Sequence, residues 1–385
     1  MNKEKKALIL ANAGGFFSFL LSDIDLLMQK GYTVRAAANG RNHMWQDTAD
    51  ALAERSVELI QVDFEGRKPL SRSNFKAYRQ VKQILRSESF DLIHCHTPVV
   101  GLIARIAARK YRKKGTKVLY TTHGFAFTKH SSRKQRLMYR SIETLGSLMC
   151  DGMITINQED YVSARKMYCK NVFYIPGVGV SLNKYHGVQI DRVAYRKILG
   201  IDPEQIMVLA VGEISARKNH RIVVEALGRI GGNVRYVFVI CGSGADSEEG
   251  QKLQELAREM GVDLRLLGFR HDIPEIMHCS DIGILPSIRE GLGLAGIQSL
   301  CAEVPVIGSN VQGIRDYIMD GKNGFLCNPY DAQAFTEKIL ELSSAELREK
   351  LRENCFRSVQ KFDLTVSRKR REEIYRIILG WQEDK

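Results

Sequence analysis

Hydrophobic and polar positions follow one repeating pattern along the chain. Short apolar runs rich in Val, Ile and Leu alternate with longer amphipathic stretches, a pattern typical of strands that are buried on both faces of a parallel sheet and joined by helices. The runs are ALILAN, TVRAAAN, VELIQVD, DLIHCH, KVLYTT and GMITIN in the first half, and IMVLAVG, YVFVICG, LRLLGF, DIGILPS, PVIGSN and GFLCNP in the second. The pattern predicts an α/β protein with doubly wound parallel sheets.

The chain is too long for one hydrophobic core, since 385 residues correspond to about two domains of ordinary size. The periodicity lapses in the glycine-rich loop IPGVGVSLNKYHGV, residues 175–188. We therefore expect a first domain over residues 1–185 and a second over residues 186–366.

Residues 367–385 are predicted to form a further helix. Its apolar positions recur at helical spacing, so one face must pack against another part of the protein. The residues expected on that face are Ile374, Ile377, Ile378 and Trp381.

Composition excludes several classes of protein. No apolar run approaches the roughly 20 residues needed to span a bilayer, and the N-terminal apolar run is interrupted by Asn12, so it is interpreted as a buried first strand rather than a signal peptide. The eight cysteines show no Cys-x-x-Cys pair, which argues against a disulfide framework or a zinc site and favours reduced thiols in a cytoplasm. In the trio His94-Cys95-His96, strand alternation points Cys95 away from the histidines, so no metal is expected there.

The net charge of +13 raises the question of an anionic partner. Between Arg105 and Arg140 the chain carries twelve lysine or arginine residues and no acidic residue. Such a block is either a solvated face or a surface for an anionic membrane. No nucleic-acid recognition signature accompanies it, so no nucleic-acid partner is expected.

Candidate binding residues follow the predicted strands, because ligands of open parallel sheets bind beyond the carboxyl ends of the strands. Gly14 and Gly15 follow the first strand and either let a phosphate or sugar approach the backbone or form a tight turn. His123 follows KVLYTT and is either a cleft residue or a hydrogen-bonded polar residue at a strand end. Arg217 and Lys218 precede an amphipathic helix, where basic side chains beside free helix N–H groups favour a phosphate site over a merely solvated pair.

The stretch SIREGLGLAGIQSLCAEVPVI, residues 287–307, combines an acid, two glycines and a helical pattern. Gly291 and Gly293 leave backbone amides accessible at the start of a helix predicted from Leu294, which suits a diphosphate. Glu290 can accept hydrogen bonds from hydroxyls at the same place. One site for an anion and a polyol is what a nucleotide-sugar requires. The run YVFVICGSGADS lacks the third glycine of a dinucleotide motif, so no nicotinamide site is predicted.

A family resemblance covers nearly the whole chain. Its carriers, in order, are the N-terminal GG, DLIHCHTP, THGFAFT, IPGVGV, VGEISARKNH, CGSG, LLGFRHDIPEIMHCSDIGILPS, REGLGLAGIQSL and DGKNGFLCNP. In this order they resemble the retaining GT-B glycosyltransferases of family 4, in the bacterial exopolysaccharide and capsule branch. The resemblance implies two Rossmann-like domains facing a central cleft, with the C-terminal helix crossing back to the first domain. It also implies an acceptor on the first domain, a donor on the second, and no metal or other cofactor.

The resemblance also assigns roles to residues. Glu290 would contact the hydroxyls of the donor sugar, His123 would line the sugar site, and Lys218 with Arg217 would hold the diphosphate. The remaining expected contacts are the amides of Gly291, Leu292 and Gly293 with the phosphates, Gly14 and Gly15 over the diphosphate, and Phe269 and Arg270 beside the base.

Two residues depart from the family pattern. Gln298 stands where the family has a second glutamate that holds the ribose, and Glu213 stands where many relatives have a diphosphate-binding arginine. Gln298 can still form a hydrogen bond to the ribose. The phosphate charge would then rest on Arg217 and Lys218.

The implied reaction transfers a hexosyl or N-acetylhexosaminyl group from a nucleotide donor, expected to be a UDP-sugar, to a lipid-linked or oligosaccharide acceptor in exopolysaccharide, capsule or O-antigen assembly. The expected location is cytoplasmic, peripheral on the inner face of the bacterial cell membrane, with the basic residues between 105 and 140 toward anionic lipid. Two alternatives stay open: a catalytically silent nucleotide-sugar binding protein and a nucleotide-sugar 2-epimerase.

Overall fold

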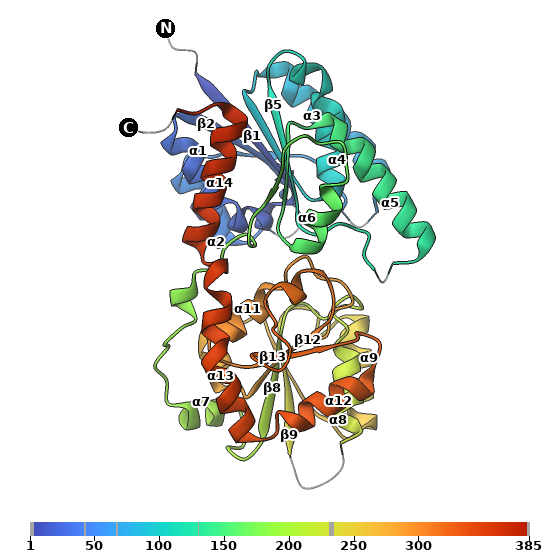
Figure 1. Cartoon of the computed structure of the whole chain (residues 1–385), viewed down its shortest axis with the longest axis vertical. Helices are drawn as coiled ribbons and strands as arrows, with labels where there is room; N and C mark the ends of the chain where they lie inside the picture. The colour runs from blue at the N-terminus through green and yellow to red at the C-terminus, as the bar shows by residue number, and fades with distance from the viewer. Residues whose placement is uncertain (1–3, 42–43, 67, 130, 231–234, 383–385) are drawn as a thin grey trace. The chain divides into compact units, whose positions relative to one another are not determined.

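The computed structural model describes residues 4–41, 44–66, 68–129, 131–230 and 235–382 (Figure 1). The chain divides into two compact units, one formed by Met1–Val178 with Thr365–Lys385 and the other by Gly179–Leu364. The expected boundaries lay slightly further along the chain, between residues 185 and 186 and between residues 366 and 367. The glycine-rich loop thus begins in the first unit and ends in the second.

The first unit contains a seven-stranded parallel sheet with the order β3-β2-β1-β4-β5-β6-β7. Its strands are β1 (Lys5–Ala13), β2 (Tyr32–Asn39), β3 (Leu59–Gln61), β4 (Leu92–His96), β5 (Lys117–Thr122), β6 (Gly152–Thr155) and β7 (Val172–Tyr174). Six of these were predicted, although β3 is shorter than expected. The edge strand β7 was not predicted.

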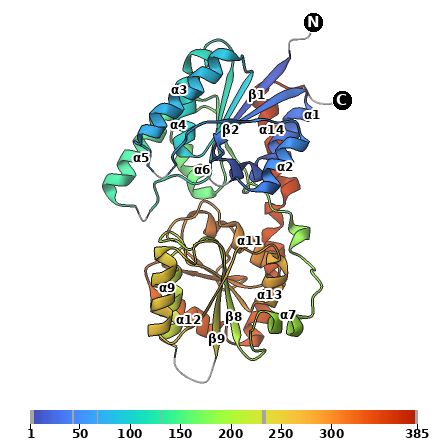
Figure 2. The same ribbon diagram turned by 180° about the vertical axis from the view of Figure 1, so that it is seen from behind.

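Helices cover both faces of this sheet (Figures 1 and 2). They are α1 (Leu21–Gln29), α2 (Gln46–Glu54), α3 (Arg72–Ser87), α4 (Pro98–Arg112), α5 (Arg133–Gly146), α6 (Gln158–Ala164) and α14 (Leu364–Leu379). Ile93 and Cys95 of β4 belong to the core cluster that also contains buried residues of α3 and α4. His94 projects from the other face of β4, where it contacts Tyr375 of α14.

Helix α14 belongs to the first unit, as the crossing-back helix of the sequence interpretation requires. Its buried residues are Ser367, Arg371, Ile374, Tyr375 and Ile378. The prediction for Ile377 was wrong, because that side chain is 56% exposed. The buried face passes through Arg371 and Tyr375, two polar side chains that a count of apolar residues alone does not include.

The second unit contains a six-stranded parallel sheet with the order β10-β9-β8-β11-β12-β13. Its strands are β8 (Ile206–Val211), β9 (Tyr236–Cys241), β10 (Asp263–Gly268), β11 (Ile282–Leu285), β12 (Val306–Ser309) and β13 (Gly324–Cys327). All six were predicted. The strand order reverses between β8 and β11, and such a switch point leaves a crevice at the carboxyl ends of the two strands.

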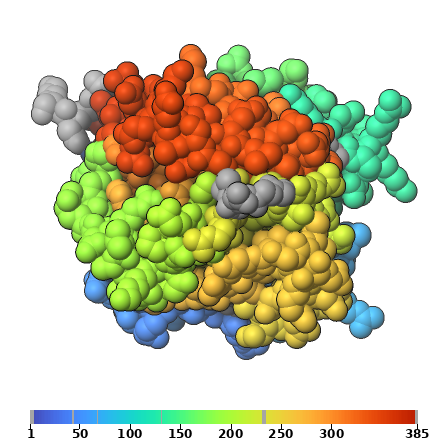
Figure 3. Space-filling model, turned by 90° about the horizontal axis from the view of Figure 1, so that it is seen from below, coloured from blue at the N-terminus to red at the C-terminus, as the bar shows by residue number. Residues whose placement is uncertain are grey.

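Helices also surround this second sheet. In the described residues they are α7 (Arg192–Ile198), α8 (His220–Gly228), α9 (Glu248–Glu259), α10 (Ile273–Cys279), α11 (Leu294–Cys301), α12 (Ala332–Glu341) and α13 (Ala345–Val359). Phe238 of β9 and Phe335 of α12 are fully buried in the core between the sheet and helices α8 and α12. Figure 3 shows the outer surface of the segment that carries α12 and α13, in orange-red, and of the segment around α9, in yellow.

All eight cysteines are free thiols and are buried. Within the part of the chain that the structure describes, no helix combines the length and the apolar character needed to cross a bilayer.

Candidate active site

Two loops of the second unit meet at the switch point, one after β8 and one after β11. The amide of Ile288 donates a hydrogen bond to the carbonyl of Arg217 at 2.9 Å. The Asn219 side chain donates to the carbonyl of Pro286 at 3.1 Å, and Asn219 itself takes the left-handed conformation, with φ of 57°, just before α8. These bonds hold the turn that carries Arg217 and Lys218 against the loop that carries Glu290.

Glu290, Lys218 and Arg217 form one ion-paired group, which we call the Glu290 group. Lys218 Nζ lies 2.9 Å and Arg217 Nη1 lies 3.0 Å from Glu290 Oε2. The hydroxyl of Ser287 donates to the same oxygen at 3.3 Å. Glu290 Oε1 has no hydrogen-bond partner among the residues that the structure describes. One carboxylate oxygen therefore holds both cations, and the other keeps its capacity to accept hydrogen bonds.

Burial opposes ionisation of Glu290, but Lys218 and Arg217 outweigh it and hold the pKa of this carboxyl below its ordinary value of 4.5. Its side chain is only 15% exposed, so water screens the ion pairs weakly. Because the pKa of Glu290 is lower in the folded state, its ion pairs stabilise the folded protein fully at pH values above the ordinary carboxyl range. This stabilisation is lost as the pH falls through the lowered pKa. Glu290 is a carboxylate at neutral pH.

Arg217 is shared between two acids. Its Nη2 lies 3.3 Å from Oε1 of Glu213, and the hydroxyl of Ser215 donates to the same oxygen at 3.3 Å. The positive charges of Arg217 and Lys218 therefore equal the negative charges of Glu213 and Glu290 in number. The sequence interpretation treated Arg217 and Lys218 as a phosphate site and Glu290 as a sugar contact, and it did not predict their pairing.

The loop over residues 291–293 is packed tightly by its own neighbours. Gly293 has φ of 78°, and a Cβ there would lie 3.0 Å from both Glu290 Cγ and the Tyr317 hydroxyl. That hydroxyl donates to the Gly293 carbonyl at 3.0 Å. From the next segment, a Cβ on Gly313 would lie 2.2 Å from the Gly291 carbonyl. Gly293 and Gly313 thus let the loop fold closely under α11, which begins at Leu294 as predicted.

The residues predicted to border the nucleoside lie on neighbouring elements of the second unit. The amide of Gln298, on α11, donates to the Tyr185 hydroxyl at 2.8 Å. Arg270 forms a two-point contact with Asp272, at 2.8 and 2.5 Å, and Asp272 also accepts from Tyr195. The ring of Phe269 is 67% exposed. No hydrogen bond within the described residues joins Gln298, Phe269 or Arg270 to the Glu290 group.

In the first unit, His123 lies at the end of β5 beside His96 of β4. His123 Nε2 and His96 Nδ1 are 3.1 Å apart. The ring of Phe16 packs edge-on against His123, with 4.8 Å between centroids. Gly14 is buried, and a Cβ on it would lie 2.5 Å from the Met44 sulfur, so its lack of a side chain serves packing within the unit.

Cys95 points away from the histidines, as predicted from strand alternation. The Cys95 side chain lies on the opposite face of the sheet from His94 and His96, and its thiol is 3.4 Å from the Leu119 carbonyl. The described residues contain no cluster of three or more His, Cys, Asp or Glu side chains placed to hold a metal ion.

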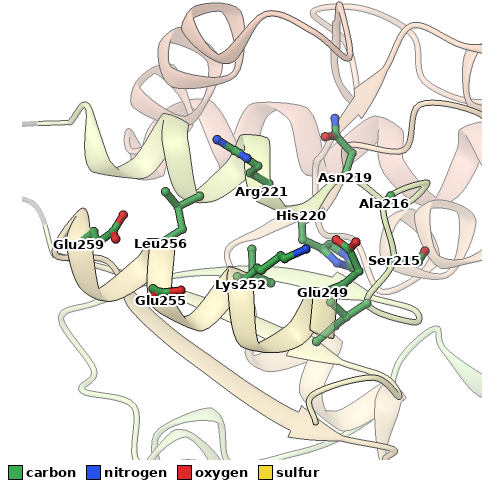
Figure 4. A pocket seen from close by; sticks show the side chains of 12 residues that line it. Ser215, Ala216, Asn219, His220, Arg221, Glu249, Lys252, Glu255, Leu256 and Glu259 are labelled. Atoms are coloured by element: carbon green, nitrogen blue, oxygen red, sulfur yellow. The ribbon is translucent and has the colours of Figure 1, made fainter. Parts of the chain in front are cut away.

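A separate cavity of about 420 Å³ lies between α8 and α9 (Figure 4). Leu253, Leu256 and Ile214 contribute apolar surface, and charged side chains of α9 stand at its rim. Ser215 and Asn219 line it from the turn that carries Arg217 and Lys218, but those two cations and Glu290 do not. The cavity is therefore adjacent to the Glu290 group without being part of it.

Both halves of the chain match families of known proteins. Residues 191–358 match the family model described as glycosyl transferases group 1, and residues 6–157 match the model described as glycosyl transferase 4-like. The chain is 33% identical over 346 residues to the provisionally named glycosyltransferase EpsD of Bacillus subtilis, and the match covers 88% of this chain and 87% of EpsD. It is 28% identical over 293 residues to the UDP-Gal:alpha-D-GlcNAc-diphosphoundecaprenol alpha-1,3-galactosyltransferase of Escherichia coli, covering 73% and 74% of the two chains.

Solved structures share the fold. Anabaena Alr3699/HepE in complex with UDP and glucose matches with a TM-score of 0.77 at 18% identity, covering 96% of this chain and 99% of that one. WaaG, a glycosyltransferase involved in lipopolysaccharide biosynthesis, matches with a TM-score of 0.73 at 18% identity, covering 97% and 100%. The two parallel-sheet units thus have the architecture of the GT-B fold.

Proposed function

This chain belongs to the group 1, 4-like glycosyltransferases, and from that premise we propose that it transfers a sugar from a nucleotide donor to a lipid-linked or oligosaccharide acceptor, with retention of the anomeric configuration. We propose a UDP-linked hexose or N-acetylhexosamine as donor, and exopolysaccharide, capsule or O-antigen assembly as the process. The Escherichia coli galactosyltransferase and the Anabaena UDP complex, by their names, support the donor, and the former supports the acceptor.

The arrangement of Glu290 carries this proposal. Its Oε2 is neutralised by Lys218 and Arg217, whereas Oε1 has no partner among the described residues and can accept a hydrogen bond from a sugar hydroxyl. A diphosphate beside the same residues would attract both cations and the backbone amides at the start of α11. The sugar and the anion of one ligand are then bound at one place.

The other proposed contacts extend the donor site. We assign the ribose to Gln298 and the base to the neighbourhood of Phe269 and Arg270. The amides of Gly291, Leu292 and Gly293 would bind the phosphates. From the first unit we assign His123 to the sugar, and Gly14 and Gly15 to the diphosphate.

The chemistry depends on where charge develops. As the bond between the anomeric carbon and the phosphate oxygen breaks, the leaving diphosphate gains negative charge. Lys218, Arg217 and the helix amides then stabilise the transition state more than the ground state. The acceptor oxygen forms its bond to the anomeric carbon from the same face, and the departing phosphate oxygen takes the acceptor proton. This scheme needs no bound metal, because Lys218 and Arg217 supply the positive charge.

Donor binding tests the proposal directly. A panel of UDP-, GDP-, ADP- and TDP-sugars at about 100 times their dissociation constants should raise stability by roughly 2.7 kcal/mol for the true donor class. We expect a thermal shift with UDP-sugars that is smaller in Glu290→Ala and Lys218→Ala. Lys252→Ala is a matched control, since Lys252 lines the separate cavity and pairs with Glu248. No shift with any member of the panel would refute the assignment.

The two alternative functions are distinguished after the binding step. A silent nucleotide-sugar binding protein would show the same thermal shift without turnover of any acceptor. An epimerase would convert the sugar of the donor without transfer. Mass spectrometry of the donor and of added lipid-linked acceptors separates the three outcomes.

We also propose an anionic membrane surface as a partner, contacted by the basic residues between 105 and 140 with the exception of Arg105. Arg105 does not belong to the exposed basic block, because it is fully buried and paired with Glu143 at 2.9 Å. Helix α5, within this region, presents exposed basic residues together with exposed apolar ones. These are Arg133, Lys134, Arg136 and Arg140, with Leu137 at 70% and Leu145 at 61% exposure. Such a mixture suits the interface of an anionic bilayer.

Vesicle co-sedimentation tests this surface. We expect binding to vesicles of phosphatidylglycerol and phosphatidylcholine that weakens as salt increases, and little binding to phosphatidylcholine alone, because each nearby basic residue contributes about 1 kcal/mol. Leu137→Glu with Leu145→Glu should reduce binding at every salt concentration. Val193→Glu with Ile198→Glu, at exposed apolar positions of α7, is the control. Binding that is insensitive to salt and to the α5 changes would contradict the proposal.

A further inference from the structure

Three histidines lie together in the first unit, His94 and His96 on one face of β4 and His123 directly after β5. The rings of His94 and His96 are 4.1 Å apart between centroids, and those of His96 and His123 are 5.4 Å apart. His94 and His96 are almost completely buried, whereas His123 is partly exposed. The protonated nitrogen of each ring can be assigned from its hydrogen-bond partners.

The tautomer of His94 is determined by the residues around it. The Tyr375 hydroxyl donates to Asp23 Oδ1 at 2.9 Å, so it can only accept from His94 Nδ1, 2.7 Å away. The Thr121 hydroxyl, 2.8 Å from His94 Nε2, then donates to that bare nitrogen. His94 is therefore protonated on Nδ1, and every polar atom of its ring is satisfied.

His96 has one partner for two ring nitrogens. Its Nδ1 lies 3.1 Å from His123 Nε2, and its Nε2 is buried without a hydrogen-bond partner among the described residues. Burial lowers the pKa of His96 well below its ordinary value and that of His123 to about 3, so both rings are neutral at pH 7. One proton is then shared along the contact, and one of the two rings donates it.

The direction of this bond is set by the buried nitrogen of His96. If His96 carried its proton on Nε2, that N–H would be a buried donor without an acceptor, and orphaned buried N–H groups are rare. If His96 carries it on Nδ1, the proton is used in the bond to His123. The second arrangement leaves no donor unpaired in the buried ring.

We propose that His96 donates its Nδ1–H to His123 Nε2 and thereby fixes His123 as the Nδ1–H tautomer. This rests on the proposed function, which assigns His123 to the donor sugar. His123 Nδ1 has no hydrogen-bond partner in the described residues, and the edge-on contact with Phe16 orients the ring. His123 then presents a hydrogen-bond donor, and not a proton acceptor, to a sugar hydroxyl. His96 is a positioning residue that acts through His123.

The Nδ1–H tautomer limits the part that His123 can take in the reaction. With Nε2 occupied by His96 and Nδ1 already protonated, His123 has no free lone pair to take the acceptor proton. Proton acceptance at this place falls to an oxygen of the leaving phosphate. His123 contributes recognition of the sugar.

Nitrogen-15 NMR of the ligand-free protein labelled in its histidines tests the tautomer without depending on the donor. The resonances of His123 are identified by their loss in His123→Gln. We expect a protonated Nδ1 and a bare Nε2. His96→Asn places an amide donor near the position of Nδ1 and should preserve this pattern, whereas His96→Leu should let His123 revert toward the Nε2–H form that neutral histidine prefers in water. Tyr375→Phe, which perturbs only the bond to His94 within this group of histidines, is the matched control.

Dissociation constants for UDP-glucose and UDP-N-acetylglucosamine supply the functional measurement. For whichever of the two binds, the loss of one hydrogen bond in His96→Leu should weaken binding about 10-fold, with His96→Asn close to the wild type. A bare Nδ1 on His123 in the wild type, or equal defects in His96→Asn and His96→Leu, would overturn the proposal. If the NMR pattern is as expected but neither nucleotide-sugar binds, the tautomer assignment stands and the donor assignment fails.

Discussion

Replacing Lys218 with Met should lower kcat for sugar transfer by about 10²- to 10³-fold, the usual effect of removing one preorganised donor from a developing negative charge. Met keeps most of the volume of the lysine stem but removes the ammonium, 2.9 Å from Glu290 Oε2. The loss should fall on kcat more than on KM, because the leaving diphosphate gains charge only as the bond breaks. Steady-state transfer assays over a range of donor concentrations measure both constants.

Lys252→Met is the matched control for this experiment, since Lys252 pairs with Glu248 at 2.6 Å and lines the cavity beside α9. Its kcat should stay close to that of the wild type. A Lys218→Met enzyme that keeps more than about a tenth of the wild-type kcat would contradict the proposed role of Lys218 in leaving-group stabilisation.

Replacing Glu143 with Ala should destabilise the first unit by about 3–5 kcal/mol, because it leaves the buried Arg105 guanidinium without its counter-charge. Glu143 lies 2.9 Å from Arg105 Nη2 and accepts a hydrogen bond from the Tyr120 hydroxyl at 3.1 Å. The guanidinium also stacks on the Tyr120 ring, 4.1 Å from its centroid. Water cannot replace the carboxylate, since Arg105 has no exposed surface.

Urea unfolding followed by tryptophan fluorescence can report on this unit selectively. The chain has two tryptophans, Trp45 and Trp381, and both lie in the first unit. The double variant Arg105→Met with Glu143→Leu is the matched control, because replacing a whole buried ion pair with apolar residues is often neutral. We expect it to recover most of the lost stability. A loss below about 1 kcal/mol in Glu143→Ala would show that the pair is not sealed from solvent.

The strands could be predicted because parallel strands buried on both faces are written as continuous apolar runs. The run IMVLAVG became β8, Ile206–Val211, with five of its six residues buried. Strand β7 gave no comparable signal, since Val172, Phe173 and Tyr174 are only three residues and all are partly exposed at the sheet edge. This edge strand takes its hydrogen bonds from β6, and three half-exposed residues are too few to show an apolar run of their own.

The site residues were found singly, but their pairing was not. Lys218 and Glu290 are separated by 72 residues, and their contact depends on β8 and β11 being adjacent in the sheet. For Arg105 the sequence did contain a sign of burial, the helical spacing of its neighbours, but we assigned it to the exposed basic block because of the surrounding charges. Arg105 stands on the same face of α4 as the buried residues Gly101 and Ala108, so helical spacing already placed it inside.

The discontinuity of the first unit has a consequence for synthesis on the ribosome. Residues 1–178 emerge long before α14, whose Arg371 and Tyr375 contact Asp23 and whose Tyr375 also contacts His94. Until residues 365–382 are made, the Asp23 carboxylate on α1 and the His94 imidazole on β4 lack the contacts that α14 supplies. The second unit, continuous from Gly179 to Leu364, does not wait for a distant segment and can complete its core first. The order of folding would then run against the order of translation, and a chain stopped before residue 365 would carry a folded second unit attached to an unfinished first one.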